Sequence, residues 1–287
     1  MGLGADARDG GDDGPTGSFD DLLDYVESSL SFATSSYNRA YLDRRVSARM
    51  RRRRVDDYDE YRSLLRDDDE EREALLNALS VNVTSFFRNP EVWDGLREVR
   101  AELSGRRRTR VWSAACSDGR EAYSVAMLAL DDDRIDERRV EILGTDIKPD
   151  ILRAARTGEY RASETDDLQS QLEPLADSDR YVDRTDDTFR VTDEVRELVS
   201  FREHDLVQEE PPRTFDLVIC RNLFIYINSG AKRAIFETLG SAVKPGGYLT
   251  IGMTETVPAD ARDRYDPVDK RLRIYRDATD DGATRGR

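Results

Sequence analysis

Two side chains on which much enzyme chemistry depends are scarce in this sequence of 287 residues. It contains one histidine, His204, and two cysteines, Cys116 and Cys220. This content excludes a disulfide framework and a metal site built on His and Cys, and it leaves little material for a Ser-His-Asp triad. No apolar run approaches the ~18 residues that cross a bilayer, and the N-terminus lacks a basic segment followed by an apolar core. We therefore expect a cytoplasmic protein without membrane insertion.

Lysine is also scarce. Four of the 45 basic residues are lysines, and the formal net charge is -15. An acidic, lysine-poor surface indicates a protein that stays soluble in high salt, and we interpret it as halophilic; an acidic mesophilic protein is the alternative. Charge of this kind bears on solubility and association rather than on fold.

Composition and periodicity divide the chain into four parts. Residues 1–17 and 277–287 are polar and are expected to be disordered tails. Residues 18–90 show apolar positions at helical spacing and predict an all-α domain. Its four helices are expected at about 19–30, 37–54, 58–65 and 73–79.

Residues 91–276 alternate between strand-like and helical patterns, which predicts a doubly wound, Rossmann-like α/β sheet. The last two strands follow each other closely, so the final strand is expected to be antiparallel. Residues of about 160–200 fit the alternation poorly and are interpreted as an insertion of three short strands; a disordered loop is the alternative. Strands are expected at 110–115, 140–144, 198–202, 215–220, 248–251 and 272–275, and helices at 121–130, 150–157 and 231–243.

In such a sheet the ligand lies beyond the carboxyl ends of the strands. The turn after the first strand, residues 116–121, has a single glycine, Gly119. It is a poor phosphate cradle, so a nucleoside ligand without phosphate fits better. Glu121 could meet a positively charged ligand group, or be an ordinary acid in a first helical turn. Asp146, after the second strand, could accept hydrogen bonds from ribose hydroxyls, or cap a loop.

Polar residues also follow the third and fourth strands. Asp205 and Leu206 could flank an adenine, whereas His204 is more simply a structural histidine. Polar side chains directly follow the buried run 217–220, and a tyrosine comes four residues later; the alternative for the tyrosine is a core position. These residues are Arg221, Asn222 and Tyr226.

One predicted helix is rich in arginine. Its buried side is marked by Leu42, Val46 and Met50, which recur every four residues. The opposite side carries Arg44, Arg45, Arg51 and Arg52. In a protein of net charge -15, such a face is expected to attract an acidic partner. A glutamate-rich helix, RNA and the protein's own acidic surface are the candidates.

Four motifs occur in a fixed order. They are Asn-x-Thr-x-Phe-Phe-Arg at 82–88, Ala-x-Cys-Ser-x-Gly-x-Glu-x-Tyr-Ser at 114–124, Thr-Asp-Ile at 145–147 and Cys-Arg-Asn-x-x-Ile-Tyr at 220–226. Together they resemble the CheR family of chemotaxis receptor methyltransferases, which esterify receptor glutamates with S-adenosylmethionine. With the composition, the resemblance favours a halophilic archaeal member.

The resemblance implies roles for individual residues. Arg88 and Tyr226 would lie at the transfer site, and the arginine-rich helix would face the glutamate-bearing helices of a receptor. The insertion would be the family's small β-subdomain. The S-adenosylmethionine pocket would be lined by Asn82, Thr84, Arg88, Glu121, Asp146, Asp205, Leu206, Arg221 and Asn222. Two features depart from the family pattern: Asp205 stands where Asn is frequent, and the insertion is short.

Three other functions are weighed against this one. An RNA methyltransferase would use the arginines on phosphates, but the net charge is negative and no aromatic residues alternate with the arginines, so we expect no nucleic-acid partner. A non-catalytic module that senses the nucleoside is a third possibility. A nicotinamide-dependent dehydrogenase is least favoured, because the first turn is poor in glycine.

Overall fold

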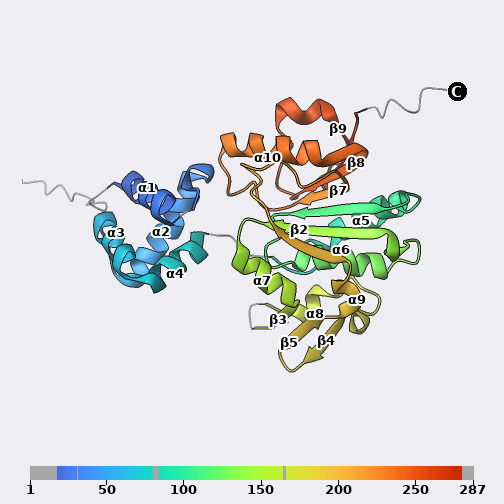
Figure 1. Cartoon of the computed structure of the whole chain (residues 1–287), viewed down its shortest axis with the longest axis horizontal. Coiled ribbons are helices and arrows are strands. Elements are labelled where there is room, and N and C mark those ends of the chain that lie inside the picture. The colour runs from blue at the N-terminus through green and yellow to red at the C-terminus, as the bar shows by residue number, and fades with distance from the viewer. Residues whose placement is uncertain (1–17, 31, 80–83, 164–165, 280–287) are drawn as a thin grey trace, which may run out of the picture. The chain divides into compact units, whose positions relative to one another are not determined.

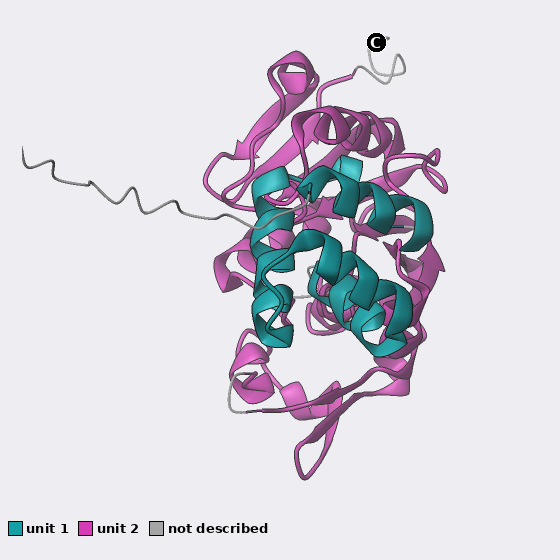
Figure 2. Ribbon diagram, turned by 90° about the vertical axis from the view of Figure 1, so that its left-hand side faces the viewer, with its two compact units in different colours: residues 1–81 teal, residues 82–287 magenta. Residues whose placement is uncertain are grey.

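The chain forms two compact units, residues 1–81 and 82–287, drawn in different colours in Figure 2. The computed structural model describes residues 18–30, 32–79, 84–163 and 166–279. No helix in these ranges is long and apolar enough to span a membrane.

The first unit is helical over its described residues. Asn38 caps α2 by accepting from the Ala40 amide, and Asp57 caps α3 by accepting from the Asp59 amide. Leu42, Val46 and Met50 are buried, as their spacing predicts. The fourth helix begins four residues earlier than expected, because its polar first turn shows no apolar period. The elements are α1 (Phe19–Leu30), η1 (Thr34–Ser36), α2 (Arg39–Arg53), α3 (Tyr58–Asp67) and α4 (Asp69–Leu79).

The second unit is built on a seven-stranded sheet with the order β6-β2-β1-β7-β8-β10-β9 (Figure 1). The first five strands in this order pair in parallel, and β10 pairs antiparallel with β8 and β9. The predicted antiparallel ending is therefore confirmed. The strands are β1 (Thr109–Ala114), β2 (Val140–Asp146), β6 (Val199–Glu203), β7 (Phe215–Cys220), β8 (Val243–Ile251), β9 (Tyr265–Asp269) and β10 (Ile274–Asp277).

Helices pack on this sheet. Contacts join α6 to β1 and β2, α7 to β2 and β6, and α10 to β7 and β8. Gly95 lets α5 approach β10, since a Cβ there would lie 2.7 Å from Ile274 Cδ1. The helices are α5 (Pro90–Leu103), α6 (Arg120–Leu130), α7 (Pro149–Thr157) and α10 (Ser229–Ala242), with short turns η2 (Glu137–Arg139) and η4 (Ala259–Arg264).

The insertion contains a small antiparallel sheet with the order β3-β5-β4, as predicted (Figure 1). A 3₁₀ turn at Ser178–Arg180 precedes the strand β4, which begins at Val182. The elements are β3 (Glu159–Arg161), α8 (Leu168–Gln171), η3 (Ser178–Arg180), β4 (Val182–Thr185), β5 (Thr188–Val191) and α9 (Asp193–Arg196).

Several elements lie where none is predicted from the sequence, among them the short helices α8 and α9, helix α5 and strand β9. Helix α5 buries Val92, Trp93 and Leu96 at helical spacing, a signal that was available but not used. Strand β9 is mostly exposed, so only its pairing with β10 defines it.

Two other boundaries are corrected. The strand expected at 248–251 begins earlier, at Val243: the Lys-Pro-Gly-Gly sequence at Lys244–Gly247 is typical of a turn, but a register shift opposite Phe215 accommodates it inside β8. The final strand begins at Ile274 rather than Leu272, since Arg273 has φ +58° and interrupts extended backbone.

Candidate active site

The site lies where strand order reverses. Strand β1 has β2 on one side and β7 on the other, with Ala114 opposite Thr145 and Ser113 opposite Ile219. The chain continues from β1 towards β2 through α6, and reaches β7 only after β6. The turns that follow β1, β2 and β7 therefore meet at one carboxyl edge, which is the position at which doubly wound sheets bind their ligands.

The turn after β1 is shaped by left-handed backbone. Ala115 and Ser117 have φ of +56° and +53°, and Gly119 has φ +88°. A Cβ at Gly119 would lie 2.8 Å from Phe201 Cζ and 2.9 Å from Ala155 Cβ, so only glycine fits there. The single glycine thus serves the tight turn and its packing. The Cys116 and Gly119 amides donate to backbone carbonyls, and the Ser117 amide donates to a side chain of the neighbouring strand.

Asp146 holds this turn to the end of β2. One carboxylate oxygen accepts from the Ser117 amide at 2.9 Å, and the other accepts from the Lys148 amide at 3.2 Å. Burial raises the pKa of Asp146, and these amides act in the opposite direction. Each oxygen keeps a lone pair, so the half-buried carboxylate can still accept from a diol.

Glu121 is the second carboxylate at this edge. Its Oε1 accepts from Ser113 Oγ at 2.8 Å, and its Oε2 lies 3.6 Å from Arg221 Nη1. Burial raises the pKa of Glu121, while Arg221, Ser113 and Arg88 lower it. This carboxylate can bind a ligand ammonium group, since an added cation favours the ionised form of a buried acid.

Arg221 joins this acid to the segment that carries Arg88. Its Nη2 donates to the Arg88 carbonyl at 2.7 Å and to Asn89 Oδ1 at 2.9 Å. The same carbonyl accepts from Trp93 Nε1 at 3.0 Å, and the guanidinium lies over the Trp93 ring. The Arg221 side chain is 1% exposed; it anchors the Arg88 backbone and also places a positive charge beside Glu121.

Glu255 is a further buried acid near this edge that the sequence analysis does not single out. Its carboxylate accepts from three backbone amides: Gly252 at 2.6 Å, Phe224 at 2.8 Å and Asn222 at 3.2 Å. Burial raises its pKa and the amides lower it. Asn222 has φ +61°, and this acceptor holds it in that conformation. Glu255 lies four residues after the end of β8, so no direct change from a buried run to a polar residue marks it in the sequence, as one marks Arg221.

The remaining predicted site residues take different places. Asp205 Oδ1 accepts from the Val207 and Gln208 amides at 2.8 and 3.3 Å, so it caps the turn after β6. Leu206 is buried. Thr84, Arg88 and Tyr226 are each half-buried. Asn82 lies outside the described residues.

His204 has structural contacts. Its Nε2 lies 2.9 Å from the Glu210 carbonyl, and its ring meets that of Trp112 edge-on at 5.4 Å between centroids. Cys116 and Cys220 are buried, and burial raises the pKa of both thiols. These three side chains therefore offer neither a reactive thiolate nor an open general base.

The arginine-rich helix α2 divides into two groups. Arg49 forms an ion pair with Glu71 of α4 at 3.0 Å, and Arg53 forms one with Asp68, the residue before α4, at 2.7 Å. The predicted basic face behaves differently: Arg44, Arg51 and Arg52 are exposed and make no ion pair among the described residues, and half-buried Arg45 lies over a tyrosine ring. This basic face comprises Arg44, Arg45, Arg51 and Arg52.

The chain matches two family descriptions that cover most of its length. Residues 17–80 match the "CheR methyltransferase, all-alpha domain", and residues 82–274 match the "CheR methyltransferase, SAM binding domain". The chain belongs to the CheR methyltransferase family. It combines the family's all-α domain with an S-adenosylmethionine-dependent methyltransferase fold, and its cofactor is S-adenosylmethionine.

Two similar proteins with known names support membership of the same family. The chain is 32% identical over 240 residues to a chemotaxis protein methyltransferase of Listeria monocytogenes, which covers 82% of this chain and 89% of that protein. It is 31% identical over 229 residues to that of Salmonella typhimurium, covering 77% of each. This CheR-family chain is therefore a methyltransferase of chemotaxis. Among solved structures, a glycopeptide N-methyltransferase bound to S-adenosylmethionine aligns with a TM-score of 0.34 and 13% identity, over 60% of this chain and 57% of that one.

Proposed function

We propose that this enzyme transfers the methyl group of S-adenosylmethionine to glutamate side-chain carboxylates of chemoreceptors, giving glutamyl methyl esters in chemotactic adaptation. The observation that supports it most is the anchored backbone of Arg88. Its carbonyl accepts from both Arg221 and Trp93. A guanidinium on a backbone fixed in this way, beside Glu121, can orient an incoming carboxylate.

The carboxylates of this edge suit the cofactor. When bound, S-adenosylmethionine supplies an electrophilic methyl group on a sulfonium sulfur. Asp146 would accept from the ribose hydroxyls, and Glu121 would contact the ammonium of the amino-acid end. Asp205 and Leu206 would flank the adenine. Contacts from Asn82, Thr84, Arg88, Arg221 and Asn222 stay predictions.

The acceptor needs no general base. A glutamate with an unperturbed pKa of about 4.3 is already ionised at neutral pH. Transfer then depends on holding the carboxylate oxygen, the methyl carbon and the sulfur in line. Arg88 would orient the carboxylate and Tyr226 would position it. Tight neutralisation by Arg88 would quench the nucleophile, so its proposed role is orientation.

The basic face of α2 is the proposed contact for the glutamate-bearing helices of the receptor. Guanidiniums bind carboxylates in two-point geometry, which survives salt better than long-range attraction. The double variant Arg51→Ala/Arg52→Ala should raise KM for receptor and leave cofactor affinity unchanged. Arg66→Ala, an exposed arginine on α3, is the matched control.

The deciding experiment incubates the purified protein in high salt with methyl-labelled S-adenosylmethionine and receptor-containing membranes from the same organism. Mild alkali then releases label from esters. Label in receptor bands that leaves as volatile methanol supports carboxyl methylation. Label in RNA would instead favour the RNA methyltransferase, and cofactor binding with no labelled product would favour a sensor.

Arg88→Ala tests the transfer site in the same assay. The variant should lose most of its turnover, and this loss should be much larger than any change in its affinity for the cofactor. Arg271→Ala, which removes an exposed arginine from the turn between β9 and β10, should keep wild-type turnover. Unchanged turnover in Arg88→Ala would remove Arg88 from the proposed mechanism. The cytoplasmic location and the halophilic origin stay predictions.

A further inference from the structure

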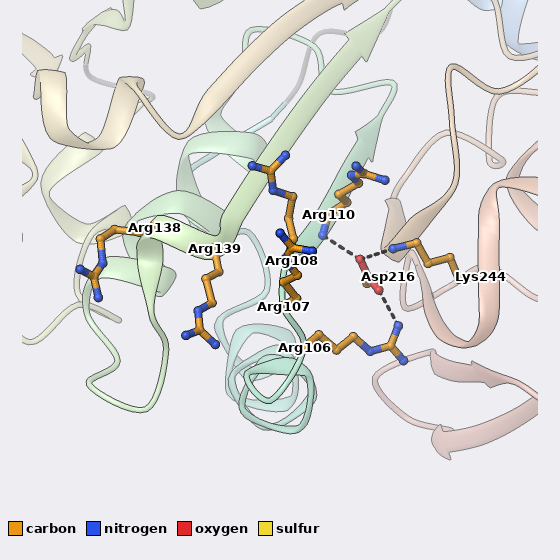
Figure 3. A pocket seen from close by; sticks show the side chains of 8 residues that line it. All are labelled: Arg106, Arg107, Arg108, Arg110, Arg138, Arg139, Asp216 and Lys244. Carbon is orange, nitrogen blue, oxygen red and sulfur yellow. Dashed lines mark hydrogen bonds and ion pairs between the residues drawn. The ribbon is translucent and has the colours of Figure 1, made fainter. Parts of the chain in front are cut away.

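A cavity of about 640 Å³ lies in the second unit at the amino ends of the central strands. Its lining residues lie before and at the start of β1, directly before β2, and near the starts of β7 and β8. In Figure 3, Arg138 and Arg139 project from one side, Asp216 and Lys244 lie on the other, and the arginines around β1 lie between them. The lining is Arg106, Arg107, Arg108, Arg110, Arg138, Arg139, Asp216 and Lys244.

Asp216 is the one acid in the lining, and it is fully engaged. Its side chain is 1% exposed and accepts from Lys244 Nζ at 2.8 Å, the Arg110 amide at 2.8 Å and Arg106 Nη1 at 2.5 Å. This acid fixes the cavity wall. It does not neutralise the other arginines.

Other acids beside the cavity are fewer than its cations. Glu141 is shared by Arg108 at 2.6 Å, Arg110 at 3.3 Å and Arg213 at 3.2 Å. Asp136 is shared by the two arginines of η2, and Glu137 lies in the same turn. Seven cations line the cavity, and Arg213 beside it makes eight. The four carboxylates Asp216, Glu141, Asp136 and Glu137 leave a surplus of four positive charges in a chain of net charge -15.

Several of these guanidiniums are available to a ligand. Arg107 makes no ion pair with any residue that the structure describes. The side chains of Arg138 and Arg139 are 82% and 51% exposed, and both contact the same acid, Asp136, so together they carry one positive charge more than this partner. Each guanidinium presents five N–H donors in a fork that matches phosphate oxygens.

The size and composition of the cavity point to a compact polyanion. Its volume lies in the range of small-molecule sites, roughly 300–1,000 Å³. The lining has no aromatic or aliphatic side chain to hold an apolar body, and an acidic protein helix would need a longer surface. We propose that this cavity binds a compact polyphosphate group, either the phosphate chain of a nucleotide or free inorganic polyphosphate.

The proposal is independent of the methyl-transfer site. The cavity lies at the amino ends of β1 and β7, whereas the residues that would hold S-adenosylmethionine follow the carboxyl ends of the same strands. Saturating S-adenosylhomocysteine can therefore fill the carboxyl edge during the test, so that a nucleotide added later reports on the arginine cavity alone.

The test is calorimetric titration of the full chain at low ionic strength. Tripolyphosphate and ATP should bind, with an affinity that falls as salt rises, and AMP should bind weakly. The triple variant Arg107→Ala/Arg138→Ala/Arg139→Ala should weaken tripolyphosphate binding by about tenfold or more. Its residues are exposed, so the fold should be unaffected, which circular dichroism checks.

Arg66→Ala/Arg153→Ala/Arg271→Ala is the matched control, because it removes three exposed arginines that do not line the cavity and should leave the affinity unchanged. Equal affinities for tripolyphosphate and ATP would identify the phosphate chain as the ligand, and tighter ATP binding would identify a nucleotide. Absence of binding, or equal loss in both variants, would overturn the proposal. Preferential binding of poly-glutamate would overturn it in favour of a protein partner.

Discussion

Replacement of Glu255 by leucine should loosen the loop that carries Asn222 and Tyr226. Leucine keeps the volume but removes the acceptor for three amides, those of Gly252, Phe224 and Asn222. The first two bonds are buried and the third is partly buried. An unsatisfied buried donor costs about 1–3 kcal/mol. We therefore expect a loss of about 2–4 kcal/mol in the free energy of unfolding, measured by urea denaturation.

The glutamine variant separates charge from geometry. Burial raises the pKa of Glu255, so a neutral side chain is tolerated better there than at an exposed site. Glu255→Gln keeps one carbonyl acceptor and should lose less stability than the leucine variant. Turnover should fall in the same order, since the loop also carries the proposed transfer residue Tyr226.

Glu237→Leu is the matched control, because Glu237 is exposed on α10. It should change stability by no more than about 0.5 kcal/mol. If Glu255→Leu were as stable and as active as this control, the loop would not depend on the three amide bonds, and the positioning role of Glu255 would be refuted.

Three further predictions concern other buried groups. Because burial raises the pKa of Asp146 above its usual 3.8, cofactor affinity should fall as pH decreases through that raised value. Asp146→Asn should bind weakly and show a smaller fall in calorimetry, the remainder coming from Glu121, whose pKa is also raised; an unchanged pH dependence would exclude Asp146 as its source. Gly144→Ala places a Cβ 2.7 Å from the Phe201 ring and should cost about 1–3 kcal/mol in thermal unfolding; wild-type stability would show that the ring moves freely. Glu71→Ala leaves Arg49 without its buried partner and should destabilise the helical unit by about 2–4 kcal/mol in urea, whereas a silent change would mean that the pair contributes no net stability.

Short sequence patterns predicted most of the long helices and the central strands, because residues close together in the chain decide which face of an element is apolar. Apolar residues at helical spacing predict the buried face of a helix, and an apolar run such as 217–220 predicts a buried strand. The alternation of such runs with helices identified the doubly wound sheet. It also located Asp146, Glu121 and Arg221, because polar residues directly after buried strands must lie at the carboxyl edge.

Local pattern failed where pairing decides the structure. Strand β9 is exposed and polar, so only its hydrogen bonds to β10 make it a strand. The glycines after Lys244 predict a turn, yet a register shift opposite Phe215 absorbs them into β8. In both cases the deciding contact joins the segment to another strand.

The sequence by itself determined the two-part organisation, the order of the strands along the chain and the residues at their carboxyl ends. Only the tertiary structure decided which partners these residues have. Arg221 holds the Arg88 backbone, 133 residues away along the chain, and Glu255 holds the Asn222 loop, 33 residues away. The arginine cavity likewise collects cations from separate elements. Such contacts depend on chain topology, which periodicity within a short segment does not encode.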